Sequence, residues 1–247
     1  MGWAQHRGTG PRAEEDPMPQ HGHTHENDHG IDHENAHENA PVAGSAEFWD
    51  GRYSESTRIW SGKPNALLVR EAEDLVPGRA LDLGCGEGAD TVWLARRGWR
   101  VTATDISTVA LGRAAEHAAE AGVGERVEWQ QHDFARSFPE GEFDLVSACF
   151  LHSHGDFPRE RILRRAAAAV APGGTLLVVG HAGGPSWNPE ALADIHFPTP
   201  EEVLAQLELP EGGWEVLTAA EHVQPMTDPE GRPGTRPDNA LRIRRVV

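Results

Sequence analysis

The amino-acid sequence predicts an α/β fold whose centre is a doubly wound, mostly parallel sheet of seven strands. Two observations carry this prediction. Between residues 79 and 207, short apolar runs alternate with helical patterns, as in parallel strands joined by helical crossovers. The last two apolar runs, 214–222 and 240–246, have no helix between them, so they are expected to pair as a hairpin. One strand near the C-terminus should therefore run antiparallel to the rest of the sheet.

Local signals bound each element in the first half of the sheet. A helical pattern over 65–75 ends at Pro77-Gly78, because proline and glycine break a helix. Ser107 is a predicted N-cap, since its hydroxyl can accept from the free N–H groups of the first helical turn. From there, alanines at spacings of four predict one helix to about residue 121. The remaining predictions are strands over 79–83, 100–104 and 126–131 and a helix over 88–97.

The second half continues this alternation up to the final hairpin. An apolar run over 143–149 predicts the fourth strand, and a helical pattern over 159–170 follows. Pro172-Gly173-Gly174 is typical of a turn, so the fifth strand is expected to cover 175–179. A short helix is predicted over 200–207. Because residues 224–238 are rich in proline, glycine and aspartate, they are predicted to form a long loop inside the hairpin.

Residues 1–46 differ from the rest of the chain in composition. They contain few large apolar side chains and many glycine, proline, histidine, glutamate and asparagine residues. Such a segment cannot bury enough apolar surface to offset the entropy that ordering would cost. We therefore predict a disordered tail over 1–46 and one folded domain over 47–247.

Histidines recur in this tail about every fourth residue. Imidazole is a common ligand of zinc, nickel and copper, and the interleaved acidic residues attract cations. We expect the tail to hold zinc or nickel loosely, without the fixed three-ligand geometry of a catalytic zinc site. The alternative is a solvated low-complexity segment with incidental metal affinity. The candidate ligands are His21, His23, His25, His29, His33 and His37.

Charge and hydropathy restrict the partners that we expect. The net charge of −17 argues against a phosphate backbone as partner, because nucleic-acid binding needs a surface rich in lysine and arginine. The most apolar run, 175–179, is far shorter than the roughly 20 residues that cross a bilayer. The first residues lack the apolar centre of a signal peptide, and two cysteines cannot supply a disulfide framework. We expect a cytoplasmic protein that acts on a small molecule, with neither nucleic acid nor a membrane as partner.

A glycine-rich loop, Leu81-Asp82-Leu83-Gly84-Cys85-Gly86-Glu87-Gly88, follows the first strand and opens a helix. Glycines at alternate positions let the backbone turn sharply and approach a ligand, and the N–H groups at the helix start suit an anionic group. The loop also fits a dinucleotide site, because Gly84, Gly86 and Ala89 satisfy the pattern GxGxxA and Asp105 follows 21 residues after Gly84. A nicotinamide-dependent oxidoreductase is therefore one candidate.

The same loop resembles motif I of class I S-adenosylmethionine-dependent methyltransferases, whereas dinucleotide enzymes rarely have an acid at the position of Asp82. The resemblance extends over about residues 48–247 and implies a Rossmann-like fold that binds S-adenosylmethionine. It implies that Asp82 holds the amino-acid end of the cofactor and that Asp105 accepts from both ribose hydroxyls. The residues that it assigns to the cofactor are Asp82, Gly84, Cys85, Gly86, Gly88, Asp105, Ile106, Asp133 and Phe134, the last three against the adenine. The alternative for Asp105 and Asp133 is that they are ordinary polar residues at strand ends.

Residues 48–65, here called the aromatic segment, contain Phe48-Trp49-Asp50-Gly51-Arg52-Tyr53 and Trp60-Ser61-Gly62-Lys63-Pro64-Asn65. The segment is similar to the start of the thiopurine, thiol and tellurite-resistance methyltransferases, in which it folds over the cofactor as a lid. Trp60 is the residue expected over the sulfonium, because a cation is attracted to an aromatic face. The alternative is that these aromatics belong to the core of an added helix.

The acceptor is expected to be a small molecule. The stretch Ser147-Ala148-Cys149-Phe150 lacks the Asn- or Asp-Pro-Pro-aromatic motif that is frequent in methyltransferases of nucleic acids and protein amides. The aromatic segment favours a thiol or a metalloid anion, which needs no strong base, although two cysteines cannot supply an arsenite site.

An oxygen or nitrogen acceptor would need a protein base. The candidates are His152 and His154, just after the fourth strand, with His181 as a third, and the alternative for each is a purely structural histidine. A further alternative for the whole chain is a non-enzymatic metal-buffering protein on a methyltransferase fold.

Overall fold

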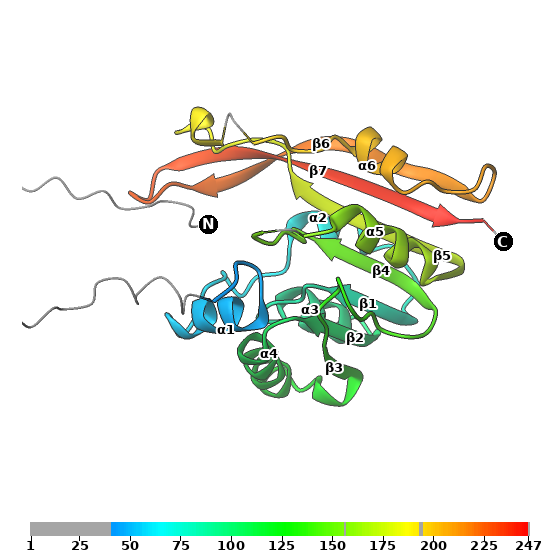
Figure 1. The fold of residues 1–247 in the computed structure, drawn as a ribbon, viewed down its shortest axis with the longest axis horizontal. Coiled ribbons are helices and arrows are strands. Elements are labelled where there is room, and N and C mark those ends of the chain that lie inside the picture. Colours follow the sequence, from blue (N-terminus) through cyan, green and yellow to red (C-terminus); the bar gives the residue numbers. More distant parts are fainter. Residues whose placement is uncertain (1–40, 156, 193–194, 247) are drawn as a thin grey trace, which may run out of the picture. The chain divides into compact units, whose positions relative to one another are not determined.

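Seven strands form one sheet in the order β3-β2-β1-β4-β5-β7-β6 (Figure 1). The computed structural model describes residues 41–155, 157–192 and 195–246. The six histidines predicted to bind metal, and most of the predicted tail, lie outside these residues. The predicted fold class, a Rossmann-like sheet of seven strands that is mostly parallel, is confirmed.

The first five strands are parallel and bring their carboxyl ends to one edge of the sheet. Their last paired residues include Leu83 beside Thr104 and Cys149 beside Val179. The predicted site residues lie at this edge, directly after the strands. Ligand sites of open α/β sheets lie at the carboxyl ends of their strands. The bounds are β1 Arg79–Leu83, β2 Arg100–Asp105, β3 Val127–Gln131, β4 Phe143–Cys149 and β5 Val170–His181.

The fifth strand begins earlier than the sequence predicts. Val170 already pairs with Phe143, whose N–H donates to the carbonyl of Ala169, and the register then shifts before Leu145. The predicted Pro172-Gly173-Gly174 turn is therefore an irregularity inside β5, where Gly173 has a φ of +79°. Tertiary pairing with β4 extends the strand beyond its local turn signal.

The chain ends in a hairpin of β6 Trp214–Thr227 and β7 Pro233–Arg245, and β7 runs antiparallel to both of its neighbours, as predicted (Figure 1). The prediction of a long loop over 224–238 is wrong, because pairing continues to Thr227 opposite Pro233. Proline is tolerated here because β6 is an edge strand and because Pro237 contributes only its carbonyl, which accepts from the N–H of Ala182.

Helices cover both faces of the sheet, which makes it doubly wound. One core lies between the sheet and α5 and α6, where Ile162 and Val203 pack on β-strand residues such as Val178. The other includes Leu68 and Leu94, from the helices on the opposite face. Within the described ranges, no helix is long and apolar enough to cross a membrane. The helices are α1 Ala46–Ser54, α2 Ala66–Ala72, α3 Ala89–Arg96, α4 Thr108–Glu120, α5 Arg159–Ala168 and α6 Pro200–Gln206.

Candidate active site

The glycine loop between β1 and α3 depends on its glycines in two ways. Gly84, Gly86 and Gly88 all have positive φ, a region that other L-residues adopt only with strain. A Cβ on Gly84 would lie 2.8 Å from Leu151 Cδ1, and one on Gly86 would lie 3.0 Å from the Tyr53 hydroxyl. The loop is tied to β2, because the N–H groups of Gly84 and its successor both donate to the carbonyl of Thr104. Its backbone is thus held open toward the edge where the strands end.

Cys85, within the loop, is partly exposed and carries a neutral thiol. Burial of its sulfur and the nearby carboxylates of Asp105 and Asp82 raise the pKa of this thiol well above its ordinary value. A thiol that resists ionisation is a poor nucleophile. Cys85 therefore fits the implied role of a residue that lines the loop.

Asp82 and Asp105 are both buried beside the loop. The carboxylate of Asp82 accepts from the hydroxyls of Thr91 at 2.6 Å and Ser147 at 3.2 Å. Burial and the neighbouring Asp90 carboxylate raise the pKa of Asp82 to about 7. A cationic group bound nearby would relieve this cost, since an opposite charge favours the ionised carboxylate.

Asp105 connects the end of β2 to the glycine loop. Its two oxygens accept from the N–H groups of Gly86 and Ser107, each at 2.9 Å. Burial raises the pKa of Asp105 above its ordinary value. Each carboxylate oxygen has two lone pairs, so both oxygens can also accept from ligand hydroxyls. With an open glycine cradle between them, the two carboxylates fit a ligand with an ammonium and vicinal hydroxyls, as S-adenosylmethionine has.

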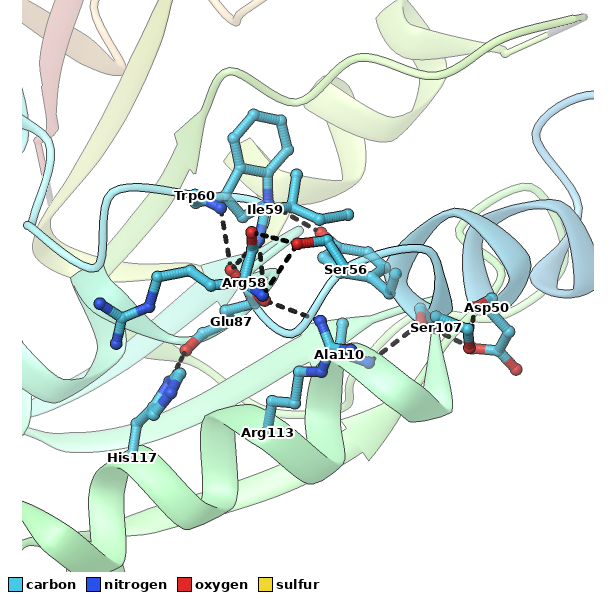
Figure 2. A network of polar contacts seen from close by, with 12 residues as sticks. Asp50, Ser56, Arg58, Ile59, Trp60, Glu87, Ser107, Ala110, Arg113 and His117 are labelled. Carbon is cyan, nitrogen blue, oxygen red and sulfur yellow. Dashed lines mark hydrogen bonds and ion pairs between the residues drawn. The ribbon is translucent and has the colours of Figure 1, made fainter. Parts of the chain in front are cut away.

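Helix α1 is fastened to the start of α4 by Asp50 (Figure 2). The Asp50 carboxylate accepts from the hydroxyls of Ser107 at 2.6 Å and Thr108 at 3.0 Å, and from the N–H of Val109 at 3.2 Å. Partial burial opposes ionisation, but these hydrogen bonds together lower the pKa of Asp50. Ser107 also caps α4, as predicted, by accepting from Ala110. The aromatic segment therefore packs against the start of α4, directly after the end of β2 where Asp105 lies.

Glu87, in the glycine loop, holds the next part of the aromatic segment. Its buried carboxylate accepts from the N–H groups of Ile59 at 3.1 Å and Trp60 at 2.9 Å (Figure 2). Arg113 of α4 donates to the same carboxylate at 3.0 Å and neutralises it. Asp90, at the start of α3, adds a further anchor by accepting from the N–H and side chain of Asn65.

The roles of Glu87 and Asp90 were not predicted from the sequence. The available signal was that one acid lies within the glycine loop and another in the first turn of the following helix. Carboxylates that are buried at such positions need hydrogen-bond donors. The sequence does not indicate which donors these are, since those lie more than 20 residues away.

Trp60 lies at the glycine loop, where the lid hypothesis requires it. Its indole N–H donates to the Tyr53 hydroxyl at 3.0 Å, and both groups approach Gly86. Tyr53 is buried, whereas Trp60 is 40% exposed. Only Tyr53 therefore has the burial of a core aromatic, and Trp60 keeps a free surface.

The residues expected against the adenine follow β2 and β3. Asp133 closes a tight turn by accepting from the N–H of Ala135 at 3.0 Å, and Phe134 packs in the core against Phe138. Ile106, which is only partly buried, accepts from the side chain of Gln131 through its carbonyl. The Phe134 ring is thus committed to the core, and the contacts of these residues with adenine stay predictions.

The three candidate histidines lie in two different places. His154 packs against Phe48 and Trp49 of α1, with ring centroids 5.1 and 6.0 Å apart, so it contacts the aromatic segment. His152 instead stacks on His181, with centroids 5.7 Å apart. Although His152 is exposed at the surface, desolvation and the charges of His181 and Arg159 lower its pKa to about 4.

His181 is the best-positioned proton acceptor of the three. Its Nδ1 lies 2.9 Å from the buried carboxylate of Asp238, which also accepts from Arg236 at 3.0 Å. A carboxylate at Nδ1 fixes the tautomer, leaves Nε2 as the acceptor and stabilises the ring once it is protonated. The sequence could have indicated this pair only if the pairing of β5 with β7 had been known.

The domain family described as a methyltransferase domain matches residues 80–174. A ubiquinone biosynthesis O-methyltransferase of Caulobacter sp. (strain K31) is 39% identical over 102 residues, which are 40% of this chain and 39% of the relative. A ribosomal RNA small subunit methyltransferase C of Chromohalobacter salexigens is 32% identical over 155 residues, 60% of this chain and 44% of the relative. The chain thus spans less than two thirds of the length of these curated relatives.

Solved structures resemble the fold over a longer stretch. The TehB protein of Haemophilus influenzae superimposes with a TM-score of 0.58 at 19% identity, covering 82% of this chain and 67% of TehB. At this identity the likeness concerns the fold alone.

Proposed function

We propose that this chain is a class I S-adenosylmethionine-dependent methyltransferase and that it transfers a methyl group to a small-molecule acceptor. The observation that carries the proposal is the pair of buried carboxylates, Asp82 and Asp105, on either side of an open glycine loop. Bound S-adenosylmethionine supplies an electrophilic methyl group on its sulfonium. The work of the protein is then to align the acceptor and exclude water, and orientation alone is worth ~7–11 kcal/mol.

Some residues of the site bind the cofactor and others cover it. We propose that Asp82 binds the ammonium of the cofactor and that Asp105 accepts from the ribose hydroxyls. Gly84, Gly86 and Gly88 let the backbone approach, and Trp60 faces the sulfonium from the aromatic segment. The support for the last assignment is that Asp50, Glu87 and Asp90 fasten this segment directly onto the glycine loop and its neighbours.

A thiol or a metalloid anion is the acceptor class that we favour. Such a nucleophile ionises by itself, and the aromatic segment resembles that of the thiol and tellurite-resistance group. The net charge of −17 disfavours an RNA acceptor, although one relative is named for ribosomal RNA. We also propose that the chain is cytoplasmic and that its tail holds zinc or nickel.

One observation favours a second candidate, methyl transfer to an oxygen or nitrogen acceptor. The His181–Asp238 pair is arranged as a general base, and a second relative is named as an O-methyltransferase. A positioned base contributes about 10²–10⁴-fold to such a transfer.

The test is transfer of the labelled methyl group of S-adenosylmethionine to a panel of thiols, phenols, amines, tellurite and ribosomal RNA. The proposal requires labelled product with at least one small acceptor and an Asp82→Asn variant that loses most of the rate. Labelling of RNA alone would overturn the small-molecule acceptor. Labelling of thiols or tellurite without phenols and amines would select the first candidate.

A further inference from the structure

A small cavity at the carboxyl ends of β4 and β5 is lined by an arginine whose buried Nε has no hydrogen-bond partner among the described residues. The cavity has a volume of about 20 Å³, which holds roughly one water-sized group. Apolar side chains that include Val178, Val203 and Leu241 form part of its wall. Its polar lining consists of His152, Arg159, His181 and Asn239. The described residues that line the cavity thus offer nitrogen-bearing side chains to a small group that enters it, and no carboxylate.

Arg159 is the strongest of these groups. Its Nε is buried and finds no hydrogen-bond partner within the described ranges, and burial lowers the pKa of its guanidinium. Arginine nevertheless stays charged in proteins. Among the residues that the structure describes, no carboxylate forms an ion pair with Arg159. Arg159 as a whole is only partly buried, but a buried N–H donor without an acceptor is costly, so the unused Nε–H indicates a ligand that can accept from it.

The buried acid beside His181 does not meet this need. Asp238 already accepts from His181 and from Arg236, which holds it with two nitrogens. Asn239 is engaged as well, since its side chain donates to the carbonyl of Pro198. Among the described residues, the cluster thus contains two arginines and one buried carboxylate, while the exposed Glu160 attracts Arg159 without forming an ion pair with it.

One residue of the cavity wall, His152, is connected to the glycine loop through its chain neighbour Leu151. His152 directly follows Leu151, whose Cδ1 lies over Gly84 at 2.8 Å from the position of an added Cβ. A ligand held between His152 and Arg159 is therefore near the loop proposed to hold the cofactor.

We propose that Arg159 binds the ionised form of the methyl acceptor, so that the substrates are small acids such as thiols, phenols or oxyacids. This inference rests on the proposed function, because it assigns the acceptor of that site. Arg159 favours the deprotonated acceptor by charge, and the Nε2 of His181 is available for the proton that the acceptor releases. The cavity admits the ionised atom and leaves the remainder of the acceptor outside.

The test uses acetate as probe and acetamide as its uncharged isostere, titrated into the full-length protein saturated with S-adenosylhomocysteine. NMR follows the Nε–H signal of Arg159, identified by its loss in Arg159→Gln, and the imidazole signals of His152 and His181. We expect acetate to shift these signals saturably and to bind at least tenfold more tightly than acetamide. Equal binding of the two probes, or binding of neither, would contradict the anion site.

Variants separate Arg159 from the general charge of its helix. Arg161→Gln removes the same charge from an exposed position of α5 and should leave the acetate shifts of the histidines unchanged. Arg159→Gln should abolish those shifts. Arg159→Lys keeps the positive charge and should retain a weakened response to acetate, so it serves as the test variant if Arg159→Gln does not fold. Acetate shifts that persist in Arg159→Gln would overturn the proposal.

Calorimetry with S-adenosylhomocysteine on the same samples separates this inference from the proposed function. Cofactor binding without acetate binding would reject only the anion site. Acetate binding without cofactor binding would show that the anion site exists but does not bind a methyl acceptor.

Discussion

The Glu87 carboxylate accepts a hydrogen bond from the backbone N–H of Trp60 at 2.9 Å, across 27 positions of sequence. Glu87 belongs to the glycine loop and Trp60 to the aromatic segment, so this contact makes the loop and the proposed lid one structural unit. A ligand that settles into the loop therefore acts on the lid directly, without an intervening element.

Breaking this contact should weaken cofactor binding. Glu87→Gln keeps an acceptor oxygen but loses the charge that faces Arg113, and we expect S-adenosylhomocysteine affinity to fall about five- to tenfold, or about 1 kcal/mol, as for one charge-assisted hydrogen bond. Calorimetry measures the affinity, and limited proteolysis should show faster cleavage within 54–63. Glu116→Gln, at an exposed position of α4, is the matched control. An unchanged affinity of Glu87→Gln for S-adenosylhomocysteine would show that the contact between the lid and the loop does not contribute to cofactor binding.

Asp82 should make cofactor binding depend on pH. Because burial and Asp90 raise its pKa to about 7, Asp82 is largely protonated at pH 6 and ionised at pH 8. The ammonium of the cofactor needs the ionised form, so the affinity for S-adenosylhomocysteine should rise between these values. Asp82→Asn should remove the inflection, and a wild-type affinity independent of pH would contradict the assignment.

The same group has the opposite effect on stability without ligand. Its folded pKa lies above the unfolded value of 3.8, so its contribution is complete below pH 4 and is lost as the pH rises through about 7. Asp82→Asn should therefore raise the melting temperature relative to wild type at pH 8 more than at pH 5. Calorimetric melting at both pH values measures the difference, and an equal change at both would exclude this linkage.

The two stacked histidines should differ as bases. For a phenol or amine acceptor, His181→Ala should reduce turnover by about 10²–10⁴-fold. His152→Ala should cost about tenfold or less, because its lowered pKa makes it a weak base at neutral pH. A pKa of about 4 also puts any limb of the rate profile that His152 controls well below the value of about 6.5 for an ordinary histidine. A larger loss in His152→Ala than in His181→Ala would reverse the assignment, and a thiol acceptor should tolerate both changes.

Removal of residues 1–40 should separate metal binding from the fold. The cut preserves Ser45, whose hydroxyl accepts from Phe48 and caps α1, so we expect an unchanged melting temperature and an unchanged affinity for S-adenosylhomocysteine. Zinc or nickel binding at pH 7.5 should be lost, and in the full chain it should be lost at pH 5, where imidazoles with a pKa of about 6.5 are protonated. If the shortened chain kept its metal, the ligands would lie outside the tail.

Local signals predicted most of the fold. The Ser107 cap, the strand ends at Leu83 and Cys149 and the final hairpin all follow from patterns within a few residues. The long hairpin did not follow, because its outer half is supported by hydrogen bonds from distant residues, such as that of Ser186 N–H to Thr235. Proline-rich composition indicated a loop where tertiary pairing builds a strand.

The residues of the glycine loop and the acids beside it could be predicted from the sequence, whereas the residues that hold the surrounding segments could not. Asp82, Asp105 and the glycines could be found because a family resemblance covers a contiguous stretch. Glu87 and Asp238 act through partners that the fold brings together, and sequence spacing carries no information on such contacts.

The central claim is that the glycine loop binds S-adenosylmethionine, and isothermal calorimetry with S-adenosylhomocysteine and with NAD tests it most directly. We predict binding of S-adenosylhomocysteine in the micromolar range, no detectable binding of NAD, and a loss of about 1–3 kcal/mol in Asp105→Asn, because buried ribose hydroxyls lose their charged acceptor. Tight binding of NAD with no binding of S-adenosylhomocysteine would contradict the account and would return the loop to the dinucleotide class.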